Sequence, residues 1–298
     1  GPSPHPKGMN RTVARIVEGT PVMEGEGVLV HRPFPSAQGL RDFDPFLLLD
    51  EMGPLELPAN AAKGFPDHPH RGFETVTYML SGRFEHRDSY GHAGKIEAGD
   101  VQWMTAGSGL VHSETPETEF RKTGGRMHGF QIWVNLPRRD KMMAPRYQEV
   151  PKAQIPEGRS EDGRVAVKVI AGESLGAKAV IDTRIPIQYL HFTIEPGAAM
   201  EQPVPKSENA FVYVFAGAAV LDGQRVDRHH LAVFQRNGDN IRIEAAADSG
   251  EPLQVLLLAA EPIGEPVARY GPFVMNTREE IEQAFDDYRS GRMGTIAH

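Results

Sequence analysis

Residues 65–76 read FPDHPHRGFETV, and this stretch decides how the rest of the chain is interpreted. It places His68 and His70 two positions apart in sequence that alternates like a β-strand. In an extended strand, residues two apart point to the same face, so the two imidazoles can converge on one point. The stretch therefore predicts a strand that presents two metal ligands on one side.

A second pair of ligand-type residues, His112 and Glu114, has the same spacing. Glycines and strand-like segments separate the two pairs, which favours two strands of one sheet or barrel. Three imidazoles and one carboxylate suit a divalent first-row metal, and an octahedral ion would keep two positions open for water, dioxygen or substrate. A closed tetrahedral zinc site is the structural alternative, although such sites usually contain cysteine and this chain has none.

Length and composition indicate a globular protein of two domains, with 298 residues and a formal net charge of -8. The acidic balance argues against a nucleic-acid surface, because phosphate binding needs clustered lysine and arginine. The lack of cysteine rules out disulfides and thiol catalysis and fits a cytoplasmic protein. No signal peptide or membrane-spanning apolar segment is visible, so we expect no membrane association.

Short apolar or alternating segments recur along the chain with turn residues between them, which predicts an all-β fold with little helix. The segments expected as strands are residues 12–17, 28–31, 46–49, 75–80, 101–104 and 130–134 in the first half, and 165–170, 189–194, 210–215, 231–234, 241–243 and 253–258 in the second. Each half then reads as an antiparallel sandwich or small barrel.

The C-terminal segment differs in kind from the rest of the chain. Thr277 and Glu280 have the spacing of a capping box, which marks the start of a helix that ends near Gly291. An apolar stripe at helical spacing predicts that this helix packs against a barrel, with Asp286 and Asp287 on its solvated face.

The expected domain boundaries follow from composition. Residues 1–8 resemble a vector-derived or disordered leader, which puts the native start at Met9. We expect an N-terminal metal-binding domain over 9–140, a charged, proline-rich linker over 141–156, and a C-terminal domain over 157–298 that lacks the metal ligands.

An overlay of the two halves indicates a duplicated unit. Matching Gly82 to Gly217 sets Pro203 and Pro205 opposite His68 and His70. After a register shift in a shorter hairpin, Arg242 lies opposite His112 and Glu244 opposite Glu114. Three of the four ligands are then missing from the second copy, which predicts a single metal site in the first.

The sequence resembles the pirins, which are members of the cupin superfamily. The resemblance rests on residues 65–76, on 99–107 (GDVQWMTAG), on 112–114 (HSE), on 131–137 (QIWVNLP) and on 270–277 (YGPFVMNT), so that it spans nearly the whole chain. It implies a bicupin: two antiparallel β-barrels of the jelly-roll or cupin type, with Fe(II) held in the first by His68, His70, His112 and Glu114. Ligand chemistry alone leaves Mn, Ni, Cu and Zn open.

The resemblance also implies an activity, quercetin 2,3-dioxygenase, in which dioxygen opens a flavonol ring. Glu114 would then act as ligand and as proton acceptor. The alternative from the same family is an iron-dependent redox sensor that binds a protein partner, in which a change of metal charge would bias a nearby loop. A fused bicupin already pairs two barrels, so we expect a monomer.

Three further residues have expected roles at this site. Glu74 follows His70 by four positions, which makes it a rival ligand or a group that orients a histidine or accepts a proton. Phe73 and Met104 are expected to line the substrate pocket, because a planar flavonol needs apolar walls.

Overall fold

A computed structural model describes residues 8–35 and 43–298, so the predicted leader falls outside the described residues except for Gly8. The chain divides into two compact units. The first barrel unit consists of residues 20–154 and 263–298, and the second barrel unit consists of residues 155–262 with the N-terminal segment up to Gly19. Each unit is an antiparallel β structure, as predicted.

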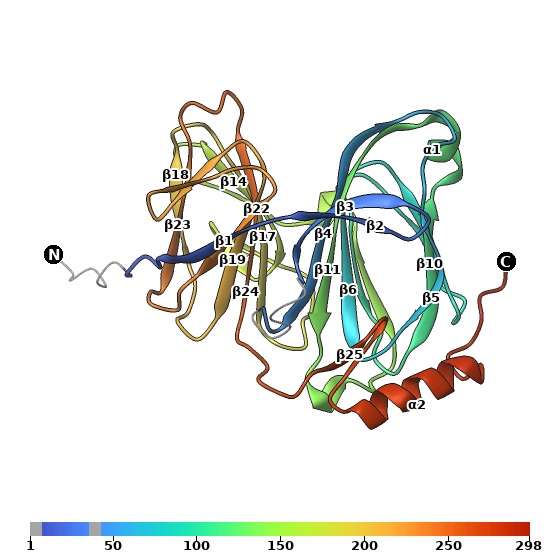
Figure 1. Cartoon of the computed structure of the whole chain (residues 1–298). Coiled ribbons are helices and arrows are strands. Elements are labelled where there is room, and N and C mark those ends of the chain that lie inside the picture. Colours follow the sequence, from blue (N-terminus) through green and yellow to red (C-terminus); the bar gives the residue numbers. More distant parts are fainter. Residues whose placement is uncertain (1–7, 36–42) are drawn as a thin grey trace. The chain divides into compact units, whose positions relative to one another are not determined.

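The first barrel unit contains a seven-stranded sheet in the order β12-β9-β6-β11-β4-β3-β2 and a four-stranded sheet in the order β5-β10-β7-β8 (Figure 1). Its strands in chain order are β2 (Thr20–Glu24), β3 (Val28–Phe34), β4 (Phe46–Leu57), β5 (Phe65–His70), β6 (Phe73–Ser81), β7 (Phe84–Asp88), β8 (Ala93–Ile96), β9 (Val101–Thr105), β10 (Leu110–Pro116), β11 (Gly125–Asn135) and β12 (Arg146–Val150), with the small hairpin β25 (Ala268–Tyr270) and β26 (Phe273–Met275). Its helices are α1 (Thr118–Thr123) and α2 (Arg278–Arg289), and two short 3-10 turns span Arg138–Asp140 and Lys152–Gln154.

The second barrel unit repeats this arrangement strand for strand. Its sheets run β1-β22-β19-β24-β17-β14-β13 and β18-β23-β20-β21. Its strands are β1 (Val13–Glu18), β13 (Glu157–Arg159), β14 (Val165–Ala171), β15 (Glu173–Ser174), β16 (Ala177–Lys178), β17 (Ile187–Ile194), β18 (Ala199–Pro203), β19 (Asn209–Ala216), β20 (Ala219–Leu221), β21 (Gln224–Val226), β22 (His230–Phe234), β23 (Asn240–Ala245) and β24 (Leu253–Ala260). The matching strand orders support the predicted duplication.

The terminal segments join units other than the expected ones. Strand β1 pairs with β22 of the second barrel unit and takes the edge position that β12 has in the first (Figure 1). Residues 263–298 belong to the first barrel unit, where α2 packs on β25 and β26. The boundaries of the compact units therefore differ from the predicted ranges 9–140 and 157–298 at both ends of the chain.

The predicted linker over 141–156 contains an ordered strand. Its residues 146–150 form β12, which pairs with β9 from Arg146↔Thr105 to Val150↔Val101. Proline is found mainly at strand ends and in edge strands, because it has no backbone N–H to donate to a neighbouring strand. Pro145 and Pro151 lie immediately before and after this edge strand. A charged, proline-bounded segment was thus compatible with a short edge strand.

The second barrel unit has an aliphatic interior. Ile241 and Ile243 of β23 belong to its buried core, together with Met200 of β18. Arg242 and Glu244 alternate with these isoleucines along β23 and form a partly exposed ion pair of 2.9 Å. A one-residue slip moves every side chain of a strand to the other face, so the overlay that set Arg242 and Glu244 opposite the ligands was wrong in register.

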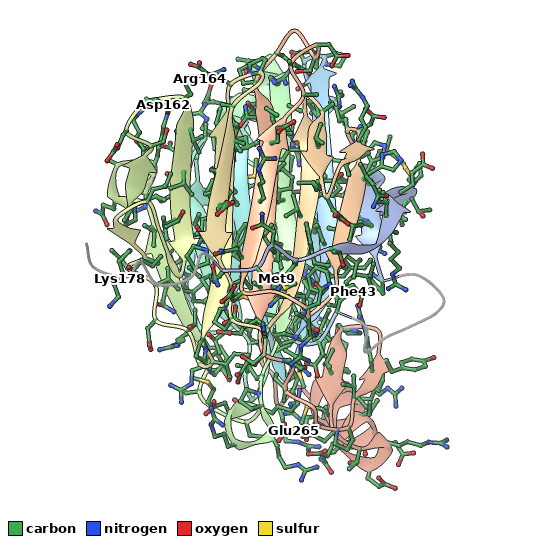
Figure 2. All side chains as sticks on the ribbon, turned by 90° about the vertical axis from the view of Figure 1, so that its left-hand side faces the viewer. Met9, Phe43, Asp162, Arg164, Lys178 and Glu265 are labelled. Atoms are coloured by element: carbon green, nitrogen blue, oxygen red, sulfur yellow. The ribbon has the colours of Figure 1, made fainter. Side chains whose placement is uncertain are left out.

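The turn between β13 and β14 shows how this unit closes its hairpins. In Figure 2, Asp162 and Arg164 lie together at this turn, and the backbone N–H of Arg164 donates to Asp162 Oδ1 over 3.0 Å. Aspartate favours turns because its side chain accepts hydrogen bonds from backbone two residues on.

The predicted C-terminal helix is confirmed as α2. Thr277 accepts a hydrogen bond from Glu280 N, and the Glu280 side chain accepts one from the N-cap backbone, which completes the capping box. Ile281 and Ala284 are its buried residues. In the part of the chain that the structure describes, neither helix combines the length and apolar character that crossing a bilayer requires.

Candidate metal centre

Strands β5 and β10 bring the two predicted ligand pairs together. They run antiparallel, with His112 directly opposite His68 and Leu110 opposite His70. Directly paired residues share a face of the sheet, so the three imidazoles point to the same side. Strand β5 is the edge of its sheet. An edge strand tolerates proline, and here Pro66 precedes the histidines and Pro69 lies between them.

The three imidazoles form a tight group. Ring centroids lie 4.3 Å apart for His68 and His112, 4.8 Å for His68 and His70, and 4.9 Å for His70 and His112. One nitrogen from each ring lies within 4.8 Å of the other two, which is a spacing that one ion can bridge.

Glu114 adjoins this group from the same strand. Its Oε1 lies 3.7 Å from His112 Nε2, and its Oε2 accepts a hydrogen bond from Thr77 Oγ1 over 3.3 Å. The pairing of β10 with β5 shifts register between His112 and Glu114, and such a bulge re-aims the side chain that follows it. The carboxylate is therefore next to the imidazoles, in contact distance of His112.

The hydrogen-bonding state of the histidines fits a metal. His68 Nδ1 donates to the Pro66 carbonyl over 2.7 Å, which leaves the Nε2 lone pair of that ring free to bind. Both ring nitrogens of His112 and Nδ1 of His70 are buried without a hydrogen-bond partner among the described residues. Buried polar atoms without a partner are costly, and a cation would satisfy those that face the group.

Burial controls the charge of each ligand. It lowers the pKa of His70 and of His112 well below the ordinary value, and the neighbouring imidazoles lower it further. Burial raises the pKa of Glu114 to about 7, against the opposing hydrogen bond from Thr77. At neutral pH the imidazoles are therefore neutral and ready to bind a cation, while Glu114 exchanges its proton easily.

Metal affinity is expected to fall as the pH drops below about 7, because a proton on Glu114 then competes with the metal. The lowered histidine pKa values keep the imidazoles neutral in this range, so they add little to the slope. The apparent association constant should fall by up to about tenfold per pH unit below the Glu114 pKa. Calorimetric titrations across that range should show the slope in the wild type and lose it in Glu114→Gln; an unchanged slope in the variant would assign it to another group.

A cavity of about 630 Å³ opens beside the imidazoles, within the first barrel unit. Its wall combines apolar residues (Val30, Leu48, Met52, Phe65 and Trp133), charged residues (Glu24, Arg32, Asp50, Asp67 and Arg269) and the predicted ligands His68, His70 and Glu114. This volume is in the range of sites for small organic molecules. The predicted ligands thus face a space large enough for a substrate.

The charged wall of the cavity is internally paired. The Arg32 guanidinium donates to both oxygens of Asp50 over 2.7 Å and to Glu24 Oε1 over 2.6 Å. Arg269 lies over the ring of Trp133, 5.2 Å from its centroid, and donates to the Leu47 carbonyl over 2.7 Å. Such fixed guanidinium groups give the cavity directional donors beside an apolar surface.

The two predicted pocket residues lie elsewhere. Phe73 is fully buried, with its ring 5.1 Å from that of His70 and 4.6 Å from that of Trp133, so it supports cavity residues from behind. Met104 is fully buried in a cluster with Ala106 and Leu110. Neither is among the described residues that line the cavity, whereas Trp133 and Arg269 are.

Glu74 also differs from its predicted place. It is buried and accepts a hydrogen bond of 2.5 Å from Thr105 Oγ1, which lies directly across the β6/β9 ladder. Strand alternation puts it on the opposite face of β6 from Thr77, whose hydroxyl contacts Glu114. The prediction assumed that His70 and Glu74 share one strand, but β5 ends at His70 and a new strand begins at Phe73.

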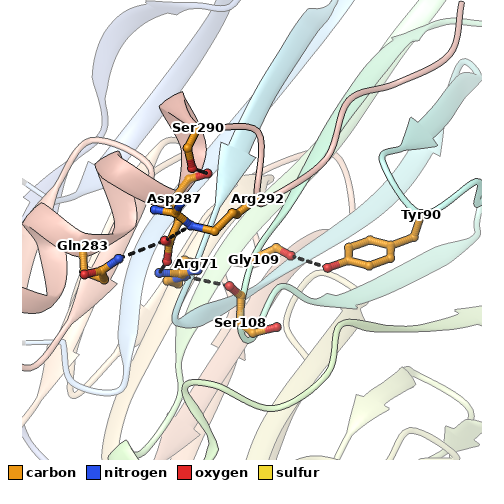
Figure 3. Close-up of polar contacts among 8 residues, drawn as sticks. All are labelled: Arg71, Tyr90, Ser108, Gly109, Gln283, Asp287, Ser290 and Arg292. Carbon is orange, nitrogen blue, oxygen red and sulfur yellow. Dashed lines mark hydrogen bonds and ion pairs between the residues drawn. The ribbon is translucent and has the colours of Figure 1, made fainter.

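The residue after His70 ties the centre to α2. Arg71 donates from Nε to the Ser108 carbonyl and from Nη1 to Asp287 Oδ2, both over 2.7 Å (Figure 3). Asp287 Oδ1 also accepts from Arg292 over 2.6 Å and from Gln283 over 2.9 Å. Asp287, predicted to be solvated, is therefore a link between the helix and strand β5, whereas Asp286 is exposed as predicted.

Replacing Asp287 with asparagine should lower the free energy of unfolding by about 1–2 kcal/mol at neutral pH, because the hydrogen bonds from arginine lose their charged acceptor. Burial raises the pKa of Asp287, but hydrogen bonds from Arg292, Arg71 and Gln283 outweigh it and lower the pKa to about 2. The contribution is then complete above the unfolded-state pKa of about 3.9 and disappears as the pH falls towards about 2.

Urea unfolding at neutral and acidic pH would measure this loss. Asp286→Asn, on the exposed side of the same helix turn, is the matched control and should leave stability unchanged. Equal effects of the two substitutions would mean that the Arg71 contact contributes nothing.

Comparison with known proteins agrees with the fold. Residues 27–134 match the pirin family model, and residues 189–294 match the model of the pirin C-terminal cupin domain. A pirin-like protein of Solanum lycopersicum is 45% identical over 95% of this chain and 93% of its own length. Human pirin is 42% identical over 96% of this chain and 95% of its own.

Among solved structures, a crystal structure of quercetin 2,3-dioxygenase from Acinetobacter baumannii superposes with a TM-score of 0.91 at 35% identity, over 97% of this chain and 100% of that one. The fold is accordingly that of a two-domain cupin protein. On these matches, the chain belongs to the pirin family.

Proposed function

We propose that this protein is a metal-dependent dioxygenase of flavonol-like substrates, with Fe(II) as the metal. The observation that carries the proposal is a group of three neutral imidazoles, of which His68 is half-buried and the other two buried, beside a carboxylate with a pKa of about 7 at the wall of a 630 Å³ cavity. The quercetin 2,3-dioxygenase named above, which shares 35% of its sequence with this chain, supports the substrate class.

His68, His70, His112 and Glu114 would hold the metal. Neutral imidazoles with one carboxylate are a donor set that accepts Fe(II) and also Mn, Ni, Cu or Zn. When bound, the metal supplies Lewis acidity, which lowers the pKa of a flavonol 3-hydroxyl beside its 4-carbonyl, and it allows reaction with dioxygen.

The chain's own residues have three tasks in this proposal. Glu114 accepts the proton of the substrate hydroxyl, because its carboxylate lies at the cavity wall beside the imidazoles. The Thr77 hydroxyl, whose single proton is shared between Gln131 Oε1 at 2.8 Å and Glu114 Oε2 at 3.3 Å, orients the carboxylate. Trp133 and the aliphatic wall contact the planar substrate and exclude water, while Arg269 offers donors to its phenolic oxygens.

A direct test is aerobic incubation of the Fe(II)-loaded protein with quercetin. We expect the flavonol absorbance to bleach, with one dioxygen consumed and one carbon monoxide released for each ring opened. Metal-free protein and protein loaded with redox-inert zinc are the controls. Absence of turnover with Fe(II), Mn, Ni and Cu would overturn the proposal.

The redox-sensing alternative stays a prediction and needs a different readout. Its expected result is that ferrous and ferric protein differ in limited proteolysis of the loops around the cavity or in binding to a protein partner. Identical behaviour of the two forms would remove it. The predicted monomer is tested by the mass of the protein in solution.

A further inference from the structure

A second group of ligand-type side chains lies in the first barrel unit and takes no part in the site described above. It consists of His86 on β7, His92 in the turn before β8, and Glu149 on β12. Glu149 Oε1 lies 2.8 Å from His86 Nε2 and 3.1 Å from His92 Nε2. The three candidate ligand atoms all lie within 4.8 Å of one another, as they do in the first group.

His86 is buried and its Nε2 faces this point. It is 1% exposed, and neither of its ring nitrogens has a hydrogen-bond partner of suitable geometry among the described residues. The 2.8 Å approach of Nε2 to Glu149 Oε1 is an ion-pair contact in which either a proton or a cation can balance the carboxylate. Two ligands about 2.0–2.2 Å from one zinc ion lie roughly 3 Å from each other, which is the spacing found here.

Gly94 leaves room where the group converges. It lies directly across the β7/β8 ladder from His86, and its backbone does not have a positive φ that would require glycine. A Cβ at this position would lie 2.8 Å from His86 Nε2 and 3.5 Å from Glu149 Oε1. The missing side chain thus keeps open the space beside the candidate ligand atoms of His86 and Glu149.

Neighbouring residues hold the two outer ligands in place. Tyr147 stacks on His92 with ring centroids 4.0 Å apart, and its hydroxyl donates to Asp88 Oδ2 over 2.8 Å. Asp88 Oδ1 accepts the backbone N–H of His92 over 2.8 Å, and Gln102 Nε2 donates to Glu149 Oε1 over 3.3 Å. Supporting contacts of this kind orient metal ligands in proteins.

We propose that His86, His92 and Glu149 form a second binding site for a divalent transition-metal ion of the zinc class. Two imidazoles and one carboxylate favour Zn²⁺, Co²⁺, Ni²⁺ or Cu²⁺ over the oxygen-seeking Mg²⁺ and Ca²⁺. The side chains of His92 and Glu149 are 36% and 44% exposed, so the ion can enter from solvent and keep a position for water. The site shares no ligand with the first, although His86 lies across the β7/β10 ladder from Glu114.

The test is the stoichiometry of Zn²⁺ binding to the whole metal-free chain, measured by calorimetry and by elemental analysis after dialysis. We expect the wild type to retain two equivalents of Zn²⁺. In His92→Ala and in Glu149→Gln the affinity for the second equivalent should fall at least about tenfold, so that one equivalent remains after dialysis. The double variant His68→Ala/His70→Ala should keep one equivalent, and adding Glu149→Gln to it should remove that one. Glu97→Gln, an exposed control on the same unit, should bind two.

Gly94→Ala tests the geometry separately and should lose the second equivalent while it keeps the first. One equivalent in the wild type, or a second equivalent that survives both His92→Ala and Glu149→Gln, would overturn the proposal and leave the group as a hydrogen-bonded cluster. Because His92 and Glu149 are partly exposed, thermal melting of their metal-free variants should match that of the wild type, which separates loss of binding from loss of folding.

Discussion

The variant His70→Ala should bind Fe(II) so weakly that metal is lost on dialysis, and flavonol turnover should fall at least about a hundredfold. His70 is enclosed within the first metal group. It is 4% exposed, and its ring contacts those of His68, His112 and Phe73. The two imidazoles and the carboxylate that remain cannot replace the missing ligand without movement of packed strands.

Metal content after dialysis and bleaching of quercetin under air would measure the two effects together. His230→Ala, which removes a partly exposed histidine of the second barrel unit, is the control and should change neither. Turnover that persists in His70→Ala at wild-type metal content would show that this histidine does not bind the active metal.

The largest expected loss of stability is that of Gly72→Ala. Gly72 connects β5 to β6 directly after the metal group and has φ +92°, a region that alanine rarely adopts. A Cβ there would lie 2.0 Å from the Val274 carbonyl oxygen and 2.7 Å from Met275 Sδ, so the backbone of β26 would have to move. We expect a loss of about 3 kcal/mol or more, from strained φ and backbone clash together.

Gly91→Ala separates these two causes. Gly91 has φ +82°, but among the described atoms nothing lies within 4 Å of its would-be Cβ. This control should lose only about 1 kcal/mol, the cost of the backbone conformation. Urea unfolding of both variants measures the difference between their losses of stability. Equal losses would mean that β26 moves away from the added methyl group at no loss of stability. Gly72→Ala should also weaken metal binding, because His70 lies two residues away.

Local periodicity predicted most of the fold. Alternation and turn residues located the strands of both units, and the capping box located α2, because each signal lies within a few neighbouring residues. The two ligand pairs were visible for the same reason. A spacing of two on a strand puts both side chains on one face, whatever the rest of the chain does.

Features that depend on distant segments were predicted poorly. Lys141 belongs to the densest basic run, which reads as a solvated loop, yet it is 2% exposed and burial lowers its pKa to about 7. Its Nζ donates to Gly72 O, Asn135 Oδ1 and Val274 O, which come from three separate segments. No local sequence pattern predicts that these three acceptors surround the Lys141 ammonium group.

The cavity wall and the second metal group have the same origin. Arg269 reaches Trp133 only because residues 263–298 return to the first barrel unit. His86, His92 and Glu149 have no paired spacing in sequence. They meet because the four-stranded sheet that contains β7 and β8 packs beside β12, the edge strand of the seven-stranded sheet. Sheet order is a property of the whole unit, and single-sequence periodicity does not contain it.

The exchange of terminal segments bears on how the protein is made. A ribosome releases β1 first, but this strand finds its partner β22 only after more than half of the chain has been synthesised. The unit with the candidate metal centre likewise waits for α2, which follows the whole of the second barrel unit in the sequence. The second barrel unit can therefore be completed once residue 262 has emerged, ahead of the first, and a nascent chain stalled at Pro262 would hold the histidine ligands but lack the helix that anchors Arg71.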